Sequence, residues 1–235
     1  MKPDAIFALF SFLASVIILS RYSSNFVETP GNRSVDVTTM ATPKGERLKP
    51  AEDGPVRSTL GQPKVDLDSY QLAVSGLVNL PFSLTWEGIQ EWPAAHTGKM
   101  IMYCIEGWEV WGDWKGILVK DLLQKASLKD NAQYVMFRCI DGYSTALPIA
   151  HLQKYDAMLA YEVNGKPLKD HDGFPLRLVA FGKYGYKWAK WVDELEVIDR
   201  PRKGTWETRG YSDRANVRVG RRRYYEGADA EPLDY

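Results

Sequence analysis

The stretch MYCIEGWEVWGDWKG, Met102–Gly116, surrounds one of the two cysteines of the chain with aromatic residues and glycines. Tryptophan and glycine recur through it at Gly107, Trp108, Trp111, Gly112, Trp114 and Gly116. Indole rings exclude water, and glycine lets the backbone approach a bulky group closely. Tryptophans are also common in ordinary cores, so the question that the stretch raises is what the thiol of Cys104 does.

Three interpretations of Cys104 follow from the residues alone. A free thiol packs like a small hydrophobic side chain in a core. In an exported protein, the other cysteine, Cys139, could pair with Cys104 in a disulfide. As a thiolate, Cys104 could instead be the ligand of a soft or high-valent metal. The residues by themselves leave these three interpretations open.

The overall composition is that of a globular protein. Of the 235 residues, 45% are hydrophobic and 26% are charged, and the formal net charge is zero. A chain without net charge has no global field that attracts nucleic acid, so we expect no nucleic-acid partner. The sequence has no GxGxxG after a strand, no GxxxxGK(S/T), no CxxC and no HExxH. These absences argue against a dinucleotide fold, a P-loop and a zinc site.

The N-terminal segment is strongly apolar. Ala5–Ser20 carries no charge and lies between Lys2 and Arg21. As a helix at about 1.5 Å per residue it would span roughly 24 Å, short of a bilayer core of about 30 Å. Residues 1–21 are therefore predicted to be a signal peptide or a membrane anchor, and the lack of an A-x-A site favours a retained anchor. We expect the periplasmic side of the inner membrane, anchored or secreted; the cytoplasmic face is the alternative, because no twin arginine precedes the segment.

The rest of the chain divides into three segments. Residues 22–65 are polar, without an apolar period, and are expected to form a linker or arm. Residues 66–200 are expected to form the folded domain. Residues 201–235 are expected to be a C-terminal extension that packs on the domain and is frayed at its end.

Short strands dominate the predicted domain. Strands are expected at residues 70–74, 99–103, 134–140, 157–163, 176–181 and 191–198. A helical period occurs at 84–92, and residues 116–123 read as a loop entering a short helix. Because there is no βαβ rhythm, the fold class is predicted to be α+β, mixed and mostly β, with short helices.

Several longer stretches occur in one order around Cys104. They are AVSGLVNLPFSLTWEGI, MIMYCIEGWEVWGDWKGILVKDLL, DGYSTALPI, LAYEVNGKPL, DGFPLRLVAFGKYGYKWAKWV and GTWETRGYS. In this combination the chain resembles the molybdopterin-binding domain of the sulfite oxidase family, over nearly the whole folded part. It is most similar to haem-free, single-domain members such as methionine sulfoxide reductase catalytic subunits. The resemblance implies a sulfite-oxidase-type fold and a molybdenum-molybdopterin cofactor.

The resemblance also implies roles for individual residues. Cys104 falls where the family ligates molybdenum through sulfur, so it is expected to be metal ligand and catalytic residue. Arg177 and Lys190 match a cofactor-binding arginine and lysine, and such cations suit a phosphate. Cys139 falls where members often carry a cofactor-contacting threonine, which counts against the disulfide. Further cofactor-binding residues are expected at Asp172, Trp188 and Ala189, and further catalytic residues at Tyr143 and Tyr186.

The chemistry implied is two-electron oxygen-atom transfer, in which the protein binds and orients while the cofactor carries the redox step. Sulfite-oxidising members hold their anion with arginines, some just after the ligand cysteine, whereas IEGWEVWGD here is acidic and aromatic. We therefore expect reduction of a small S-oxide or N-oxide. Sulfite oxidation, with Arg138 reaching in, is one alternative, and a non-catalytic binding module on the same fold is another. Glu106 and Asp113 are candidate proton carriers.

Three partners are expected. The first is a small-molecule substrate. The second is a separate electron-transfer protein, a membrane haem protein or a cytochrome, because no haem-binding domain is recognisable in the sequence. The third is the membrane, through residues 1–21.

Overall fold

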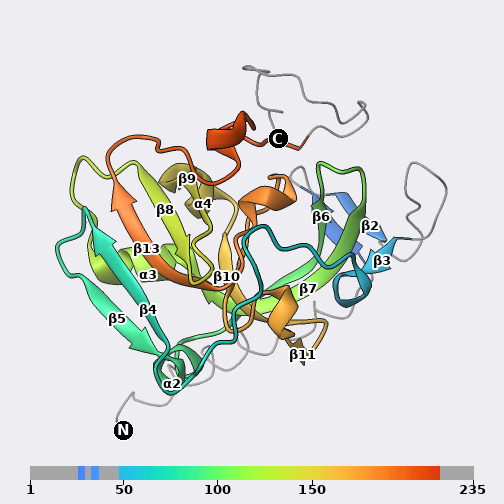
Figure 1. Ribbon diagram of the computed structural model, residues 1–235, viewed down its shortest axis with the longest axis horizontal. Coiled ribbons are helices and arrows are strands. Elements are labelled where there is room, and N and C mark those ends of the chain that lie inside the picture. The colour runs from blue at the N-terminus through green and yellow to red at the C-terminus, as the bar shows by residue number, and fades with distance from the viewer. Residues whose placement is uncertain (1–25, 30–32, 37–47, 218–235) are drawn as a thin grey trace, which may run out of the picture.

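Two mixed β-sheets and a separate hairpin make up the described part of the protein (Figure 1). The computed structural model describes residues 26–29, 33–36 and 48–217. The predicted signal or anchor at 1–21 lies outside these residues, and so does the end of the C-terminal extension. Within the described residues, no helix combines the length and hydropathy needed to cross a membrane.

Among the described residues, the larger sheet consists of β3 (Lys49–Pro50), β6 (Ala95–Tyr103), β7 (Glu109–Leu118), β10 (Met158–Val163), β11 (Lys166–Pro167) and β12 (Arg177–Val179). Its order is β11-β10-β7-β3, with β12 beside β10 and β6 beside β7. β3 runs parallel to β7, and the other pairs are antiparallel. β10 lies near the centre of the molecule (Figure 1).

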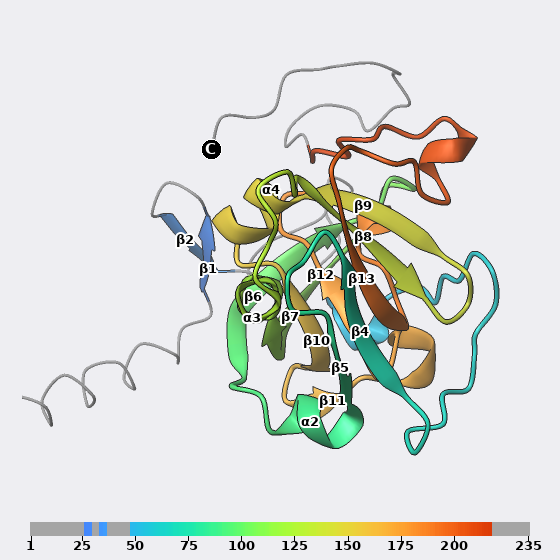
Figure 2. The same cartoon turned by 90° about the vertical axis from the view of Figure 1, so that its left-hand side faces the viewer.

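The smaller sheet consists of β4 (Gln71–Gly76), β5 (Phe82–Thr85), β8 (Tyr134–Cys139), β9 (Ser144–Pro148) and β13 (Val192–Ile198). Its order is β5-β4-β13-β8-β9, and β4 and β13 are parallel. This pairing joins the beginning of the predicted domain to its end. The hairpin of β1 (Phe26–Thr29) and β2 (Arg33–Asp36) stands apart from both sheets, with β1 in contact with β6 (Figure 2).

The helices are short. In the described residues they are α2 (Trp86–Gln90), α3 (Val119–Ala126), α4 (Ile149–Lys154) and the 3-10 turns η1 (Ala51–Asp53), η2 (Asp170–Asp172), η3 (Gly185–Lys187) and η4 (Glu207–Arg209). α3 buries Val119, Leu122, Leu123 and Ala126. This is the spacing that places apolar side chains on one face of a helix, and it explains why a helix forms there.

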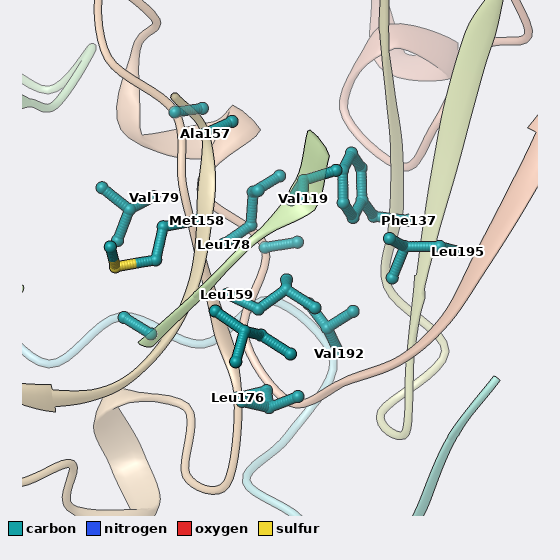
Figure 3. Close-up of a cluster of buried hydrophobic side chains, with 14 of the residues drawn as sticks. Val119, Phe137, Ala157, Met158, Leu159, Leu176, Leu178, Val179, Val192 and Leu195 are labelled. Atoms are coloured by element: carbon teal, nitrogen blue, oxygen red, sulfur yellow. The ribbon is translucent and has the colours of Figure 1, made fainter. Parts of the chain in front are cut away.

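The hydrophobic core lies between the two sheets. Leu159 of β10 and Leu178 of β12 are fully buried and lie beside Val192 and Leu195 of β13 (Figure 3). β10 and β12 are buried along almost their whole length, as expected of strands that are covered on both faces. The core therefore fixes the two sheets against each other and holds the strand ends that surround the site described below.

The glycines of the quoted stretch serve strand packing. In β7, alternate positions face inward, and Gly112 and Gly116 occupy two of them beside the buried Trp114. A Cβ on Gly116 would lie 2.0 Å from the carbonyl oxygen of Leu159 in β10. The two strands could not approach as they do with any larger residue at this position. The close packing of the sheet therefore accounts for Gly112 and Gly116, and no bound group is needed to explain them.

The predicted class, α+β with mixed sheets and short helices, is confirmed. The strands expected at 70–74, 134–140, 157–163 and 191–198 correspond to β4, β8, β10 and β13. The loop expected at the start of 116–123 is wrong, because β7 continues to Leu118 and passes directly into α3. The alternation of buried and partly exposed positions in β7 is not visible in the sequence, because two of the buried positions are glycines without an apolar side chain.

Two segments outside the predicted domain lie against it. Leu48 is buried, and β3 pairs with Val110 and Trp111 of β7, so the end of the expected arm is attached to the larger sheet. At the other end, Thr205 N–H donates to the carbonyl of Ser144 at 2.8 Å, at the start of β9. Both segments contribute to the site.

Candidate active site

A cavity of about 370 Å³ opens where five separate segments of the chain meet. Its size is in the range of small-molecule and cofactor sites. The segments are 57–59, 102–108, 141–143, 185–191 and 206–211. Six of the predicted site residues line it, namely Cys104, Tyr143, Tyr186, Trp188, Ala189 and Lys190.

Cys104 lies in the turn between β6 and β7. Its N–H donates to the carbonyl of Trp108 at 2.8 Å, and the N–H of Gly107 donates back to the Cys104 carbonyl at 3.1 Å. Gly107 has φ of +93°, a conformation that glycine adopts without strain. The tight turn presents the partly exposed thiol to the cavity.

The two cysteines form no disulfide. Cys139 is buried at the end of β8, and its N–H donates to the carbonyl of Tyr143 at 3.0 Å. Burial raises the pKa of the Cys139 thiol well above its ordinary value, so this residue stays protonated at neutral pH. Cys139 does not line the cavity, although its neighbour Asp141 does. The disulfide interpretation is therefore wrong, and cofactor contact by Cys139 stays a prediction.

The three indoles of the quoted stretch have three different surroundings. Trp108 lines the cavity, and its Nε1 donates to Glu106 at 2.9 Å. Trp114 is buried, with its ring 5.9 Å from the ring of Trp188. Trp111 packs with a separate small cluster around Leu48. Only the first of the three faces the cavity, so the others belong to the packing of the sheet.

Arg177, which is buried, and Lys190, which is partly buried, form an antiparallel β-bridge beside the cavity, and we call the two residues the cationic cluster. Arg177 Nη1 donates to the carbonyl of Asp172 at 3.2 Å, and Nη2 lies 3.0 Å from the sulfur of Met102, which lines the cavity. Lys190 Nζ donates to the carbonyls of Arg57 and of His171, at 2.8 and 2.7 Å. Lys190 thus lines the cavity directly, whereas Arg177 and Asp172 lie one residue behind it.

The cationic cluster is strained electrostatically. Burial lowers the pKa of Arg177 to about 10. Burial, and then the charge of Arg177, lowers the pKa of Lys190 to about 7. Two neighbouring cations with lowered pKa values would be stabilised by an anion that both could bind.

Three buried polar atoms around Arg177 have no hydrogen-bond partner among the described residues. They are Arg177 Nε, the Nε1 of Trp114 and the Oδ2 of Asp172. The guanidinium lies 5.3 Å from the ring of Trp114 and hydrogen-bonds the backbone of Asp172, so the three residues form one group. Buried polar atoms are normally satisfied. Two donors and one acceptor left over beside two cations fit a ligand that carries a phosphate and a heteroaromatic ring with polar edges, as molybdopterin does.

The two predicted catalytic tyrosines are bound to backbone carbonyls. The hydroxyl of Tyr143 donates to the carbonyl of Tyr186, and the hydroxyl of Tyr186 donates to that of Ser212 at 2.8 Å. Burial raises the pKa of both phenols, so both are protonated at neutral pH. Each lines the cavity, and their catalytic role stays a prediction.

Sequence reasoning missed the contributions of the arm and of the C-terminal extension. Arg57 lines the cavity, and its Nε donates a hydrogen bond to the carboxylate of Glu106 at 2.8 Å. The Nε1 of Trp206 donates to the Oγ1 of Thr59 at 3.2 Å, which joins the two missed segments. Arg209 also lines the cavity. Trp206 and Arg209 lie in the GTWETRGYS stretch, which was part of the family resemblance. Nothing in the sequence of the polar arm pointed to Arg57.

No arginine follows Cys104 directly, as the sequence shows, but arginines reach the cavity from other segments. The residues directly after Cys104 are acidic and aromatic, but Arg57 and Arg209 arrive from segments far away in the sequence. Arg138 pairs with Glu194 and Glu196 on the smaller sheet and does not line the cavity. Asp113 is likewise outside the lining, 4.0 Å from His96.

A buried ion pair holds the C-terminal extension in place. Lys187 pairs with Glu207, and both side chains are almost completely buried. Lys187 Nζ also donates to the carbonyl of Ala146 at 3.0 Å, and Thr145 Oγ1 donates to Glu207 at 2.7 Å. This anchor fixes η4, and with it the wall that Trp206 and its neighbours form.

Replacing Lys187 with methionine is expected to lower the free energy of unfolding by about 3–5 kcal/mol, because it leaves the Glu207 carboxylate buried and unpaired. The double variant Lys187→Met/Glu207→Leu is expected to recover most of that loss, since a pair of apolar side chains is tolerated in the same volume. Urea unfolding measures both. A double variant as unstable as the single one would contradict this account.

The chain is similar to several known proteins. A family model described as "Oxidoreductase molybdopterin binding domain" matches residues 59–206. The chain is 34% identical over 152 residues to the uncharacterized oxidoreductase YuiH of Bacillus subtilis, covering 64% of this chain and 76% of that protein. It is 32% identical over 149 residues to the putative protein-methionine-sulfoxide reductase subunit YedZ1 of Azospira oryzae, 63% of this chain and only 56% of that protein.

Among solved structures, the sulfane dehydrogenase SoxCD of Paracoccus pantotrophus has a similar fold. The TM-score is 0.59 at 21% identity, over 86% of this chain and 57% of that chain. At this identity the likeness concerns the fold alone. The family match spans most of the described domain and includes Cys104 and the cationic cluster. The chain belongs to the oxidoreductase molybdopterin binding domain family.

Proposed function

We propose that this protein is a molybdopterin-dependent oxidoreductase that transfers an oxygen atom, and that it reduces a small S-oxide or N-oxide. The observation that carries the proposal is that Cys104 and Lys190 line one cavity, with Arg177 bridged to Lys190 directly behind it. A thiolate is a suitable ligand for molybdenum, and two neighbouring cations suit the phosphate of the cofactor. The unpartnered polar atoms around Arg177 support the same assignment.

In this proposal each residue has a defined task. When bound, the molybdenum cofactor supplies the two-electron exchange and the site of oxygen transfer. Cys104 holds the metal, and Lys190 and Arg177 hold the anionic end of the cofactor. Tyr143, through its bond to the carbonyl of Tyr186, fixes the segment that carries the cofactor contacts.

Proton supply is assigned to Asp141. Reduction of a sulfoxide to a sulfide and water consumes two electrons and two protons. Glu106 has a lowered pKa, because Trp108 and then Arg57 donate hydrogen bonds to it, so it stays ionised at neutral pH. Burial raises the pKa of Asp141, which also lines the cavity and is therefore the better proton carrier.

The proposal includes an electron-transfer partner and a location. Electrons come from a separate haem protein, and the relative from Azospira oryzae, which is named as a subunit, supports a multi-chain arrangement. The apolar residues 1–21 support a membrane-attached or secreted protein on the periplasmic side. Both statements are part of the proposal.

Sulfite oxidation is the second candidate function. Arg57 and Arg209 bring two guanidinium groups to the cavity, and an arginine is well suited to bind an oxyanion. In that direction sulfite and water would give sulfate, two protons and two electrons, with the electrons passing to the separate partner.

Elemental analysis and turnover assays of the full-length chain test the proposal. The chain is purified from a host that makes molybdopterin and, as control, from one that does not. We expect stoichiometric molybdenum from the first host only, with sulfoxide-dependent oxidation of reduced benzyl viologen. Sulfite-dependent reduction of ferricyanide without sulfoxide turnover would favour the second candidate. A metal-free and molybdopterin-free chain from the competent host would contradict both.

A further inference from the structure

One side of the cavity is a continuous series of aromatic rings. The ring of Tyr186 lies 5.2 Å from that of Tyr211, and Tyr211 lies 4.6 Å from Trp206. The guanidinium of Arg209 lies 5.0 Å from the centre of the Trp206 ring. All four residues line the cavity. We call Tyr186, Trp206 and Tyr211 the aromatic wall.

The aromatic wall is held from two directions. Trp206 donates its indole hydrogen bond to Thr59, and the hydroxyl of Tyr186 donates to the carbonyl of Ser212. Directly beside Trp206, Glu207 is anchored in the interior by Lys187. The rings and the guanidinium stacked on them are therefore positioned before any ligand binds.

Arg209 brings a guanidinium group to the cavity, where the nearest acids in the described part of the chain have other partners. Glu106 is engaged by Arg57 and by Trp108, and Glu207 by Lys187. Among the described residues, Arg209 forms no ion pair with a carboxylate. Its guanidinium lies over the Trp206 ring, and the N–H groups at its edge can donate hydrogen bonds to a bound anion.

We infer that Arg209 and the aromatic wall determine substrate specificity, and that the substrate is a sulfoxide with an apolar body and a carboxylate or sulfonate group. The apolar body lies on the rings, and the anionic group meets the guanidinium of Arg209. This inference rests on the proposed function for the sulfoxide, but the recognition of the anionic group is independent of turnover. A neutral sulfoxide of the same shape would lose the charged contact, which forms outside the reacting centre.

Binding of two unreactive sulfones tests the inference. The probes are 4-(methylsulfonyl)benzoate and methyl phenyl sulfone, which share the ring and differ in the carboxylate. Calorimetry on the cofactor-loaded, full-length chain is expected to show about tenfold tighter binding of the carboxylate probe, equivalent to one charge-assisted contact at a partly exposed site. Added salt is expected to reduce this preference, because the contact is exposed.

Three variants locate the preference. Arg209→Gln is expected to abolish the ratio between the two dissociation constants, and Arg209→Lys to retain part of it, since lysine keeps the charge without the planar fork. Arg200→Gln is the matched control, because Arg200 is an exposed arginine that pairs with Asp199 and does not line the cavity. Its ratio is expected to equal that of the wild type.

The outcomes separate the inference from the proposed function. Equal binding of the two probes by the wild type, or an unchanged ratio in Arg209→Gln, overturns the inference. Turnover of 4-(methylsulfinyl)benzoate and of methyl phenyl sulfoxide is measured in parallel. If sulfoxides are reduced without a carboxylate preference, the proposed function stands and the inference fails. If the binding preference depends on Arg209 but neither sulfoxide is reduced, anion recognition stands and the reductive direction fails.

Discussion

Replacing Cys104 with serine is expected to lower the rate of oxygen-atom transfer by more than about 100-fold. Removing a residue that only hydrogen-bonds to a metal ligand already lowers activity by up to about 100-fold, and loss of the ligand itself is expected to cost more. A serine hydroxyl stays protonated at neutral pH and is a hard oxygen donor, so it is a poor substitute for a soft thiolate. The organic part of the cofactor is expected to remain, because in the proposed function its phosphate is bound by Arg177 and Lys190 and not by Cys104. Turnover assays and a molybdopterin assay on the same preparation measure the two effects.

Cys139→Ser is the matched control for this experiment. Cys139 is buried, its pKa is raised, and it lies outside the cavity lining. We expect the control to keep molybdenum and turnover. Full activity of the Cys104 variant, or loss of metal from the Cys139 variant alone, would show that the metal ligand has been assigned to the wrong cysteine.

Replacing Lys190 with methionine is expected to lower cofactor occupancy by at least about tenfold, the effect of losing one charge-assisted contact to a phosphate. The same change is expected to alter how the stability of the cofactor-free protein depends on pH. Burial lowers the pKa of Lys190 in the folded protein to about 7, below its ordinary value of 10.5. Between these values the unfolded chain holds a proton that the folded chain lacks, so the free energy of unfolding rises with pH in this window.

The size of the pH effect is bounded. One proton contributes a slope of at most about 1.4 kcal/mol per pH unit. The penalty is fully present below pH 7 and is lost by pH 10.5. Lys183, whose pKa burial lowers to about 8, titrates in the same window, so the variant is compared with the wild type and the difference is assigned to Lys190.

Urea unfolding of the cofactor-free proteins between pH 7 and pH 10 measures this difference. Lys190→Met is expected to show a shallower rise than the wild type. Lys129→Met, which changes an exposed lysine, is the control and is expected to follow the wild type. Parallel curves for wild type and Lys190→Met would mean that Lys190 is protonated normally in the folded state.

The candidate site illustrates which parts of a site a sequence can reveal. Cys104, Arg177 and Lys190 were predicted from the family resemblance, which depends on ordered stretches of sequence around each of them. Of the predicted set, Cys139, Asp172 and Arg177 lie behind the cavity lining. Whether a residue lines the cavity or lies behind the lining depends on how the strands pack together, and a local sequence pattern does not contain this information.

Long-range contacts account for the errors. Lys190 bonds to the backbone of Arg57, 133 residues away, and Trp206 bonds to Thr59, 147 residues away. The expectation of an S-oxide or N-oxide substrate was based on the residues next to Cys104 and did not include arginines from distant segments. Arg209 reaches the cavity because Glu207 and Lys187 form a buried pair between two distant segments.

By itself, the sequence determined the α+β class and most central strands, and its resemblance to a known family pointed to the cysteine that lines the cavity. These features depend on periodicity and on motifs that span a few residues, and such local preferences act before the chain is packed. Only the tertiary structure decided that the glycines of the quoted stretch serve strand packing, that one indole of three faces the cavity, and that Arg57 and Arg209 complete it. The physical reason is that these outcomes follow from contacts between distant segments, which form only when the core between the two sheets is closed.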